Sequence, residues 1–216
     1  RYAFEGNERT ETAEWVVDTS GRGKHLARRM DLEQPSPIRH GASFLWVEGL
    51  EDIEKLTDLS LDEIRLRQDR AQTGHFPVWL ATNHYVGEGF WFWVIPLQGK
   101  TSLGVVYDSA LFPADQVATP QKLLEWVCRE FPLFARDLPR RKILDHGSFR
   151  SYAYDCAETL AAAKWALSGE AGRFSDPLYS PGGDLIALHN TLIADLILTA
   201  DDRERARKVP LYETLL

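Results

Sequence analysis

Glycine and carboxylate residues gather in a segment whose types and spacing suit the binding of a large polar ligand. Gly169 and Glu170 follow a short apolar run, and Gly182 and Gly183 precede a long helical pattern. Glycine lets a ligand approach the backbone closely, and a carboxylate accepts hydrogen bonds from ligand hydroxyl groups. The first N–H groups of a helix stabilise negative charge. These residue types could line a ligand site; a glycine-rich loop that caps a core helix is an equal alternative.

A similar turn lies near the start of the sequence. In residues 16–22 an apolar run ends at Asp18 and is followed by a turn at Gly21. Such a turn can bring backbone N–H groups close to a ligand. Taken by itself, this segment is more typical of an ordinary strand end.

Aromatic residues alternate in residues 90–97, which include Trp91 and Trp93. Alternation of this kind indicates a strand, and its large side chains either fill a core or line an aromatic cavity. His84 lies just upstream and could face such a cavity, although a surface or turn histidine is the more common case. His189 lies among leucines in a helical pattern, so we expect a hydrogen-bonded helix residue there rather than a base.

Four short motifs follow one another in the sequence: D-x-S-G-R at 18–22, W-x-W-x-I-P at 91–96, G-E-A-G at 169–172 and D-P-x-x-S-x-G at 176–182. In type, order and spacing they resemble the flavin-dependent halogenases and the related FAD monooxygenases over nearly the whole chain. The resemblance implies an α/β (α+β) fold in which a β-sheet substrate domain is inserted into an FAD-binding domain. Residues 1–35 and 156–216 would then belong to the FAD-binding domain, and residues 36–155 would form the substrate domain.

The resemblance also assigns roles to individual residues. The residues that it implies for FAD binding are Asp18, Gly21, Gly169, Glu170, Asp176, Pro177, Gly182 and Gly183. Those that it implies for the substrate cavity are Trp91, Trp93, Ile95, Pro96 and Tyr179, and His84 is added to them by its position just upstream of the strand. The two tryptophans would separate the flavin from an aromatic or other electron-rich organic substrate. The implied chemistry is activation of O2 at reduced flavin, with NAD(P)H or a separate flavin reductase as the source of electrons.

Three positions depart from the family pattern. Glu170 stands where the family usually has Asp, which keeps the charge on a longer side chain. Tyr179 stands where tryptophan halogenases have a catalytic Glu, so no catalytic residue is assigned. Pro181 has no N–H to give to a halide in the adjoining loop, and one lost donor costs about 1–3 kcal/mol. A plain FAD oxygenase or dehydrogenase of the same fold is therefore as well supported as a halogenase.

The dinucleotide-binding fingerprint G-x-G-x-x-G does not occur in the sequence. Its glycines let a pyrophosphate approach a helix N-terminus. We therefore expect the N-terminal nucleotide-binding part of the fold to be absent and FAD binding by these residues alone to be weak. Two alternatives remain open: a non-catalytic fragment or binding subunit, and one half of a split flavoenzyme whose other half is a second chain.

The charge and composition of the chain exclude some classes of binding partner. The net charge is −7, from 25 basic and 32 acidic residues, which argues against nucleic acid or an anionic membrane surface. No run approaches the roughly 18 apolar residues of a membrane-spanning helix. The two cysteines form neither a disulfide framework nor a metal site, so a reduced cytoplasmic protein without a bound metal is expected. The basic run 136–142 is expected to be a solvated loop.

Strands and helices that could position these residues can be placed from hydrophobic periodicity. Strands are expected at 2–4 and 14–17 (as a hairpin), 38–48, 76–82, 90–97, 101–107 and 164–167, with a turn at 98–100 and an extended segment at 142–154. Helices are expected at 25–30, from a Ser-x-x-Glu capping box at Ser60 to a stop at Gly74, after Thr119-Pro120, and at 183–200.

Overall fold

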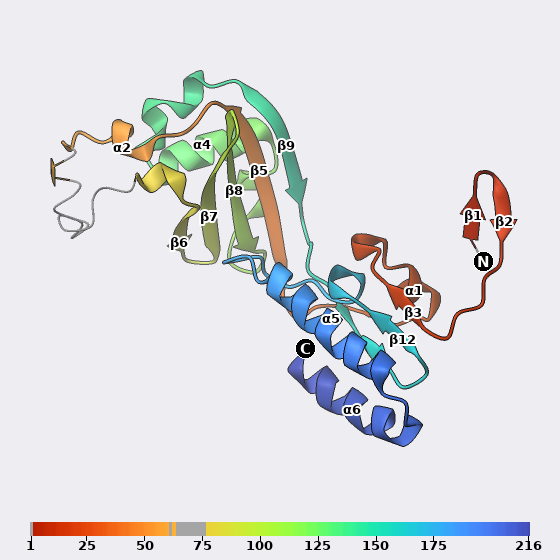
Figure 1. Cartoon of the computed structure of the whole chain (residues 1–216). Helices are drawn as coiled ribbons and strands as arrows, with labels where there is room; N and C mark the ends of the chain where they lie inside the picture. The colour runs from red at the N-terminus through yellow and green to blue at the C-terminus, as the bar shows by residue number, and fades with distance from the viewer. Residues whose placement is uncertain (1, 61, 64–76) are drawn as a thin grey trace. The chain divides into compact units, whose positions relative to one another are not determined.

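The computed structural model describes residues 2–60, 62–63 and 77–216, which divide into two compact units (Figure 1). One unit combines the segment that ends at Ile38 with Ala153–Leu216, and the other is Arg39–Tyr152. The second unit is therefore inserted between two segments of the first. Each unit contains both strands and helices.

The second unit is built on a sheet of five antiparallel strands in the order β6-β7-β8-β5-β9. The strands are β5 (His40–Glu48), β6 (Asn83–Gly87), β7 (Phe90–Leu97), β8 (Lys100–Asp108) and β9 (Ile143–Phe149). The predicted hairpin of β7 and β8 is confirmed. Gly99 lies in its turn with a φ of +73°, a conformation that glycine adopts without a steric penalty.

One face of this sheet packs against helix α4 (Pro120–Glu130). Leu123, Trp126 and Val127 of the helix are buried with Phe92 and Val105 of the sheet in one hydrophobic cluster. Because successive side chains of a strand point to opposite faces, the residues between them on β7 are left on the other face. The predicted N-cap is confirmed, since the Thr119 hydroxyl accepts a hydrogen bond from the Lys122 N–H at 3.3 Å.

The first unit combines a three-stranded sheet with two helices. Strand β12 (Trp165–Leu167) lies between β3 (Val16–Asp18), which runs parallel to it, and β11 (Leu160–Ala161), which runs antiparallel. Helices α5 (Gly182–Leu198) and α6 (Asp202–Leu215) follow, as Figure 1 shows. The buried cluster of this unit joins strand and helix residues: Leu160, Ala166, Leu192, Ile193 and Leu196.

Short elements complete the two units. In the first unit they are β1 (Tyr2–Phe4), β2 (Asn7–Arg9), η1 (Gly21–Gly23), α1 (His25–Arg29), β4 (Glu33–Gln34), β10 (Asp155–Cys156) and η6 (Gly169–Ala171). In the second they are α2 (Ile53–Leu56), η2 (Val78–Leu80), η3 (Ala114–Gln116), η4 (Phe134–Arg136) and η5 (Leu138–Arg140). Among the described residues, no helix combines the length and the apolar character needed to cross a membrane.

Two strand predictions are wrong. Residues 2–4 pair with Asn7–Arg9, whereas Val16–Asp18 pairs with Trp165–Leu167. A tight turn at Glu5-Gly6 closes the first hairpin locally, and the distant partner of β3 left no local signal. In the predicted strand 76–82, Val78–Leu80 is a 3₁₀ turn, and the strand begins only at Asn83. Pro77 removes an N–H that a sheet would use.

Helix α6 was not predicted, because its charged sequence and internal Pro210 hide any apolar periodicity. Tertiary contacts hold it in place. Arg205 is 3% exposed, and its guanidinium donates to the backbone oxygens of Leu196 and Thr199 at the C-terminal end of α5. These bonds satisfy carbonyl groups that a helix end leaves unpaired.

The capping box at Ser60 is present. The Ser60 N–H donates to a Glu63 carboxylate oxygen at 2.8 Å, and the Glu63 N–H donates to the Ser60 hydroxyl at 3.3 Å. The remainder of the predicted helix and its stop at Gly74 lie outside the described residues.

The basic run 136–142 is not simply a solvated loop, because the half-buried side chain of Arg141 contacts two carboxylates. Its Nε atom lies 2.7 Å from Oε2 of Glu51 and 2.5 Å from Oδ2 of Asp137. The N–H itself is directed at Asp137, so the contact with Glu51 is mainly Coulombic. The guanidinium also donates to the backbone oxygens of Glu48 and Leu50, at 2.8 Å each. Glu51 is 3% exposed, and burial raises its pKa to about 7 against the attraction of Arg141.

This buried carboxyl predicts a pH-dependent stability. The folded chain holds the Glu51 proton more tightly than the unfolded chain does. The contribution of Glu51 to the free energy of unfolding is therefore complete below about pH 4.5 and is lost as the pH rises through about 7. We expect the unfolding free energy of the wild type to fall by up to about 3 kcal/mol across that range, and we expect Glu51→Gln to abolish this fall. Urea unfolding at several pH values measures the slope.

The matched control is Asp58→Asn, which removes a carboxylate that is 86% exposed in its pair with Arg136. This variant should keep the wild-type slope. An equal slope in the wild type and in Glu51→Gln would contradict the assignment.

Candidate functional site

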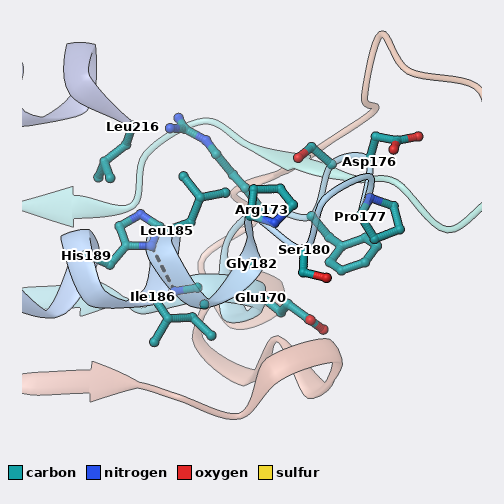
Figure 2. A pocket seen from close by; sticks show the side chains of 15 residues that line it. Glu170, Arg173, Asp176, Pro177, Ser180, Gly182, Leu185, Ile186, His189 and Leu216 are labelled. Carbon is teal, nitrogen blue, oxygen red and sulfur yellow. Dashed lines mark hydrogen bonds between the residues drawn. The ribbon is translucent and has the colours of Figure 1, made fainter. Parts of the chain in front are cut away.

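A cavity of about 260 Å³ lies in the first unit beside the N-terminal end of α5 (Figure 2). Its wall combines the turn after β12, the following loop and the first two turns of the helix. Six of the eight residues predicted to bind FAD line it: Gly169, Glu170, Asp176, Pro177, Gly182 and Gly183. The structure therefore brings together the glycines and carboxylates of two separate motifs.

The turn at Gly169 requires glycine for two independent reasons. Its φ is +55°, in the left-handed region that side chains disfavour. A Cβ atom at this position would also lie 2.5 Å from Cγ1 of Ile186 on α5. The backbone of the turn can therefore lie directly against the helix, which places Glu170 at the wall of the cavity.

Three side chains hold this turn. The Tyr154 hydroxyl donates to the backbone oxygen of Glu170 at 2.6 Å, and the Gly169 N–H donates to Nδ1 of His189 at 2.9 Å. The Ser168 hydroxyl lies 2.8 Å from Oδ1 of Asn190 and donates to it. Burial, and secondarily the nearby Glu170 carboxylate, raise the pKa of Tyr154 to about 12, so its hydroxyl stays protonated as a donor.

His189 is the most deeply buried side chain of the cavity wall that can titrate. It is 3% exposed, and its Nε2 atom has no hydrogen-bond partner among the described residues. Burial, with Arg173 nearby, lowers its pKa, so the neutral ring is favoured. The expectation of a hydrogen-bonded helix residue at this position is confirmed.

The N-terminus of α5 offers backbone N–H groups to the cavity. Pro181 precedes the first helical residue, and no side chain caps the helix. A Cβ atom at Gly182 or at Gly183 would meet no atom within 4 Å, so the space beside the first turn is open. Uncapped first-turn N–H groups together with the helix dipole favour an acceptor or a negative charge there.

The loop that leads into α5 is tightly built. Asp176 accepts a hydrogen bond from the Leu178 N–H at 2.8 Å, and the Ser180 N–H donates to the Pro177 oxygen at 2.8 Å. Tyr179 and Ser180 have positive φ values of +59° and +58°. Two consecutive non-glycine residues in this region are unfavourable unless their surroundings hold them, and such strain concentrates at functional sites.

Arg173 anchors the same loop, although no local sequence signal identified it. Its guanidinium pairs with Asp155 at 2.8 Å and with Glu213 of α6 at 3.2 Å. Only the fold brings these three residues together. Tyr154 and Asn190 were missed for the same reason.

Asp18 and Gly21 do not line this cavity. The Asp18 carboxylate accepts hydrogen bonds from the N–H groups of Ser20 and Leu26, at 2.8 and 2.6 Å. Burial alone would raise its pKa, but these bonds outweigh burial and lower it. The Asp18 backbone oxygen accepts from the Ser168 N–H at 2.9 Å, so Asp18 supports the strand that leads to Gly169. Its direct contact with a cofactor stays a prediction.

The predicted substrate-cavity residues of the second unit lie mostly on one face of its sheet. Trp91, Trp93 and Ile95 of β7 point away from the face that packs against α4, and Pro96 falls on the opposite face by alternation. His84 pairs with Trp93 across the strands, and its ring lies 5.4 Å from that of Trp91. The structure thereby brings together three of the predicted residues: His84, Trp91 and Trp93.

The ring of Trp93 occupies the space where a side chain of residue 104 would lie, and residue 104 is a glycine. A Cβ atom on Gly104 of the neighbouring strand would lie 2.2 Å from the indole ring. The indole Nε1–H donates to the Ser102 hydroxyl at 3.1 Å, which fixes the orientation of the ring. Tyr179 belongs to the other unit, where it is 78% exposed, so its assignment to the same cavity stays a prediction.

Known proteins resemble this chain in sequence and in structure. The flavin-dependent halogenase chlA of Dictyostelium discoideum is 24% identical over 215 residues, which are 96% of this chain and 34% of that protein. The tetracycline 7-halogenase of Kitasatospora aureofaciens is 29% identical over 184 residues, 80% of this chain and 31% of that protein. No family model matches the sequence.

A solved structure matches this chain in fold. The crystal structure of halogenase PltM in complex with phloroglucinol and FAD superposes with a TM-score of 0.69 at 18% identity, covering 93% of this chain and 40% of that one. This chain is a relative of the flavin-dependent halogenases. It spans about a third of the length of its curated halogenase relatives. The predicted α/β fold, that of part of a flavin-dependent halogenase, is confirmed.

Substitution of Gly169 tests the close approach of the turn to α5. We expect Gly169→Ala to lower the free energy of unfolding by about 2–4 kcal/mol, because it adds both left-handed strain and overlap with Ile186. Chemical denaturation measures the change. The control is Gly183→Ala, where the added methyl group meets nothing within 4 Å and helix propensity improves by roughly 0.5–1 kcal/mol. Equal effects of the two substitutions would refute the steric account.

Substitution of Gly104 tests whether the indole ring of Trp93 occupies the space above this glycine. Gly104→Ala should lower stability by about 1–3 kcal/mol, because the ring must leave its position. In a Trp93→Leu background the same substitution should cost less, as a double-mutant cycle measured by urea unfolding would show. The cost that remains comes from the Ser43 backbone oxygen, which the added Cβ atom would meet at 2.8 Å. Additive losses would mean that the indole does not occupy the space above Gly104.

Proposed function

We propose that the cavity beside α5 binds the ribityl and isoalloxazine portions of FAD, and that the protein takes part in a flavin-dependent oxidation. The observation that carries the proposal is the convergence of the Glu170 turn and the uncapped N-terminus of α5 on one cavity. Kinship with the flavin-dependent halogenases supports the same ligand.

The lining residues fit this group. Glu170 can accept hydrogen bonds from ribityl hydroxyls, and the N–H groups of Gly182 and Gly183 can stabilise negative charge on the pyrimidine side of a reduced flavin. The open space beside these two glycines leaves room for a planar ring. When bound, reduced flavin supplies the electrons for O2 activation.

A volume of about 260 Å³ is small for a whole dinucleotide, since ligand cavities usually measure roughly 300–1,000 Å³. We therefore propose that the nucleotide half of FAD is held by polypeptide beyond these 216 residues, either in the same chain or in a second one. In this proposal the first unit is the flavin-binding part and the second is the substrate-binding part. Reducing equivalents would come from NAD(P)H or from a flavin reductase.

The open aromatic face of the second unit suits an aromatic or electron-rich organic substrate. Trp91 and Trp93 offer flat apolar surface for stacking, and His84 adds a polar group beside them. The relative PltM was solved with phloroglucinol, a phenolic ring. We propose a substrate of this class for the present protein, and a cytoplasmic location in view of its free Cys128 and Cys156.

Halogenation and oxygenation are both candidate reactions. Sequence similarity favours halogenation. Pro181 and Tyr179 favour oxygenation, because Pro181 offers no N–H to a halide and Tyr179 offers no carboxylate. Dependence of product formation on chloride or bromide separates the two reactions.

Flavin binding by Glu170 is the first point to measure. We expect Glu170→Ala to weaken FAD binding by at least about tenfold, because it removes a charged hydrogen-bond acceptor worth about 1.5–3 kcal/mol. Quenching of FAD fluorescence on titration with the protein gives the dissociation constant. The control is Glu8→Ala on exposed strand β2, which should bind as the wild type does.

Unchanged affinity in Glu170→Ala would remove this residue from the flavin site. A wild-type protein that binds no FAD would instead favour the second candidate function, a non-catalytic binding subunit.

A further inference from the structure

We propose that His189 is a positioning residue that holds the Gly169–Ala171 turn in its ligand-binding shape, and that it does so only as a neutral imidazole. The inference rests on the proposed function, because the turn is the part of the cavity that carries Glu170. It goes further in making flavin affinity depend on the protonation of a residue that does not touch the reacting atoms.

The hydrogen bond to Gly169 determines the tautomer of His189. A backbone N–H can only donate, so Nδ1 must present its lone pair at the distance of 2.9 Å that separates the two nitrogens. In the neutral ring the proton then resides on Nε2, which is buried at the cavity wall near Arg173 and Leu185, as Figure 2 shows. The opposite tautomer would set two N–H groups against each other.

Protonation of the ring would remove the acceptor that the Gly169 N–H has among the described residues. The turn cannot shift toward α5 to find another, because the Ile186 side chain already lies against Gly169. A buried N–H without an acceptor is costly, so the turn would move or the protein would lose stability. In either case the Glu170 carboxylate would leave the position that it holds in the neutral form.

The surroundings of the ring also oppose a positive charge. The charged groups that face it are Arg173, from the loop after the turn, and Glu213, from α6. Arg173 disfavours protonation and Glu213 favours it, while burial of the ring is the largest influence and lowers the pKa. Arg173 is itself paired with Asp155 and Glu213, so much of the attraction of Glu213 is already directed to the guanidinium.

We therefore expect the affinity for FAD to fall as the pH falls. The pKa of His189 in the folded chain lies below its ordinary value, so the neutral form prevails at neutral pH. As the pH falls through that pKa, the fraction of chains with the turn in place falls with it. The apparent dissociation constant for FAD should then rise by up to about tenfold per pH unit.

The test combines nuclear magnetic resonance with FAD titration on the whole 216-residue chain. Imidazole ¹⁵N spectra should show a protonated Nε2 and an unprotonated Nδ1 for His189, and the Gly169 amide resonance should shift with the titration of that ring. FAD fluorescence titrations between pH 5 and pH 8 then give the pH profile of the affinity.

Three variants isolate the role of the imidazole. His189→Asn keeps an acceptor oxygen near the position of Nδ1 but cannot be protonated, so it should bind FAD about as tightly as the wild type does at pH 8, with a flat profile. His189→Leu has no acceptor and should bind about tenfold more weakly at pH 8. His25→Asn, at an exposed position on α1, should keep the wild-type profile.

Two results would overturn the proposal: a His189→Asn profile as steep as that of the wild type, or a Gly169 amide that ignores the titration of His189. Failure of every variant to bind FAD at every pH would contradict the proposed function instead. The resonance of the Gly169 amide would in that case still decide whether His189 holds the turn.

Discussion

The close approach of the Gly169 turn to helix α5 is the constraint on which the candidate site depends. Because residue 169 has no side chain, its backbone can lie against Ile186. That proximity lets two neighbouring helix residues, His189 and Asn190, bind the Gly169 N–H and the Ser168 hydroxyl. The same arrangement sets the end of β12 beside the N-terminus of α5, so that one cavity is lined by both a carboxylate and helix N–H groups.

A glycine and a polar side chain also position an aromatic residue in the second unit. Strand alternation gives the sheet one face that packs on α4 and another that carries Trp91 and Trp93. Gly104 leaves the space in which the Trp93 ring lies, and Ser102 accepts the hydrogen bond of its indole N–H. In both units, therefore, a glycine creates the space and a polar side chain fixes the orientation of the functional group.

In each unit a half-buried arginine forms ion pairs with two carboxylates. Arg141 joins Glu51 and Asp137 in the second unit, while Arg173 joins Asp155 and Glu213 in the first. Each arginine links segments that are distant in the sequence, and its planar set of five donors allows it to serve several acceptors at once. These networks are the reason that charged stretches of the sequence, which suggest solvated loops, contribute to the interior.

The sequence by itself determined the features that depend on local order. It predicted the β7–β8 hairpin, the Thr119 cap, helix α5 and the relationship to the flavin-dependent halogenases, because turn chemistry, periodicity and motif spacing are local properties. Only the tertiary structure decided which residues share a site. The pairing of β3 with β12, the contact of Arg141 with Glu51 and the contact of His189 with Gly169 all join residues from separate elements, and their geometry is set by packing, which no local pattern records.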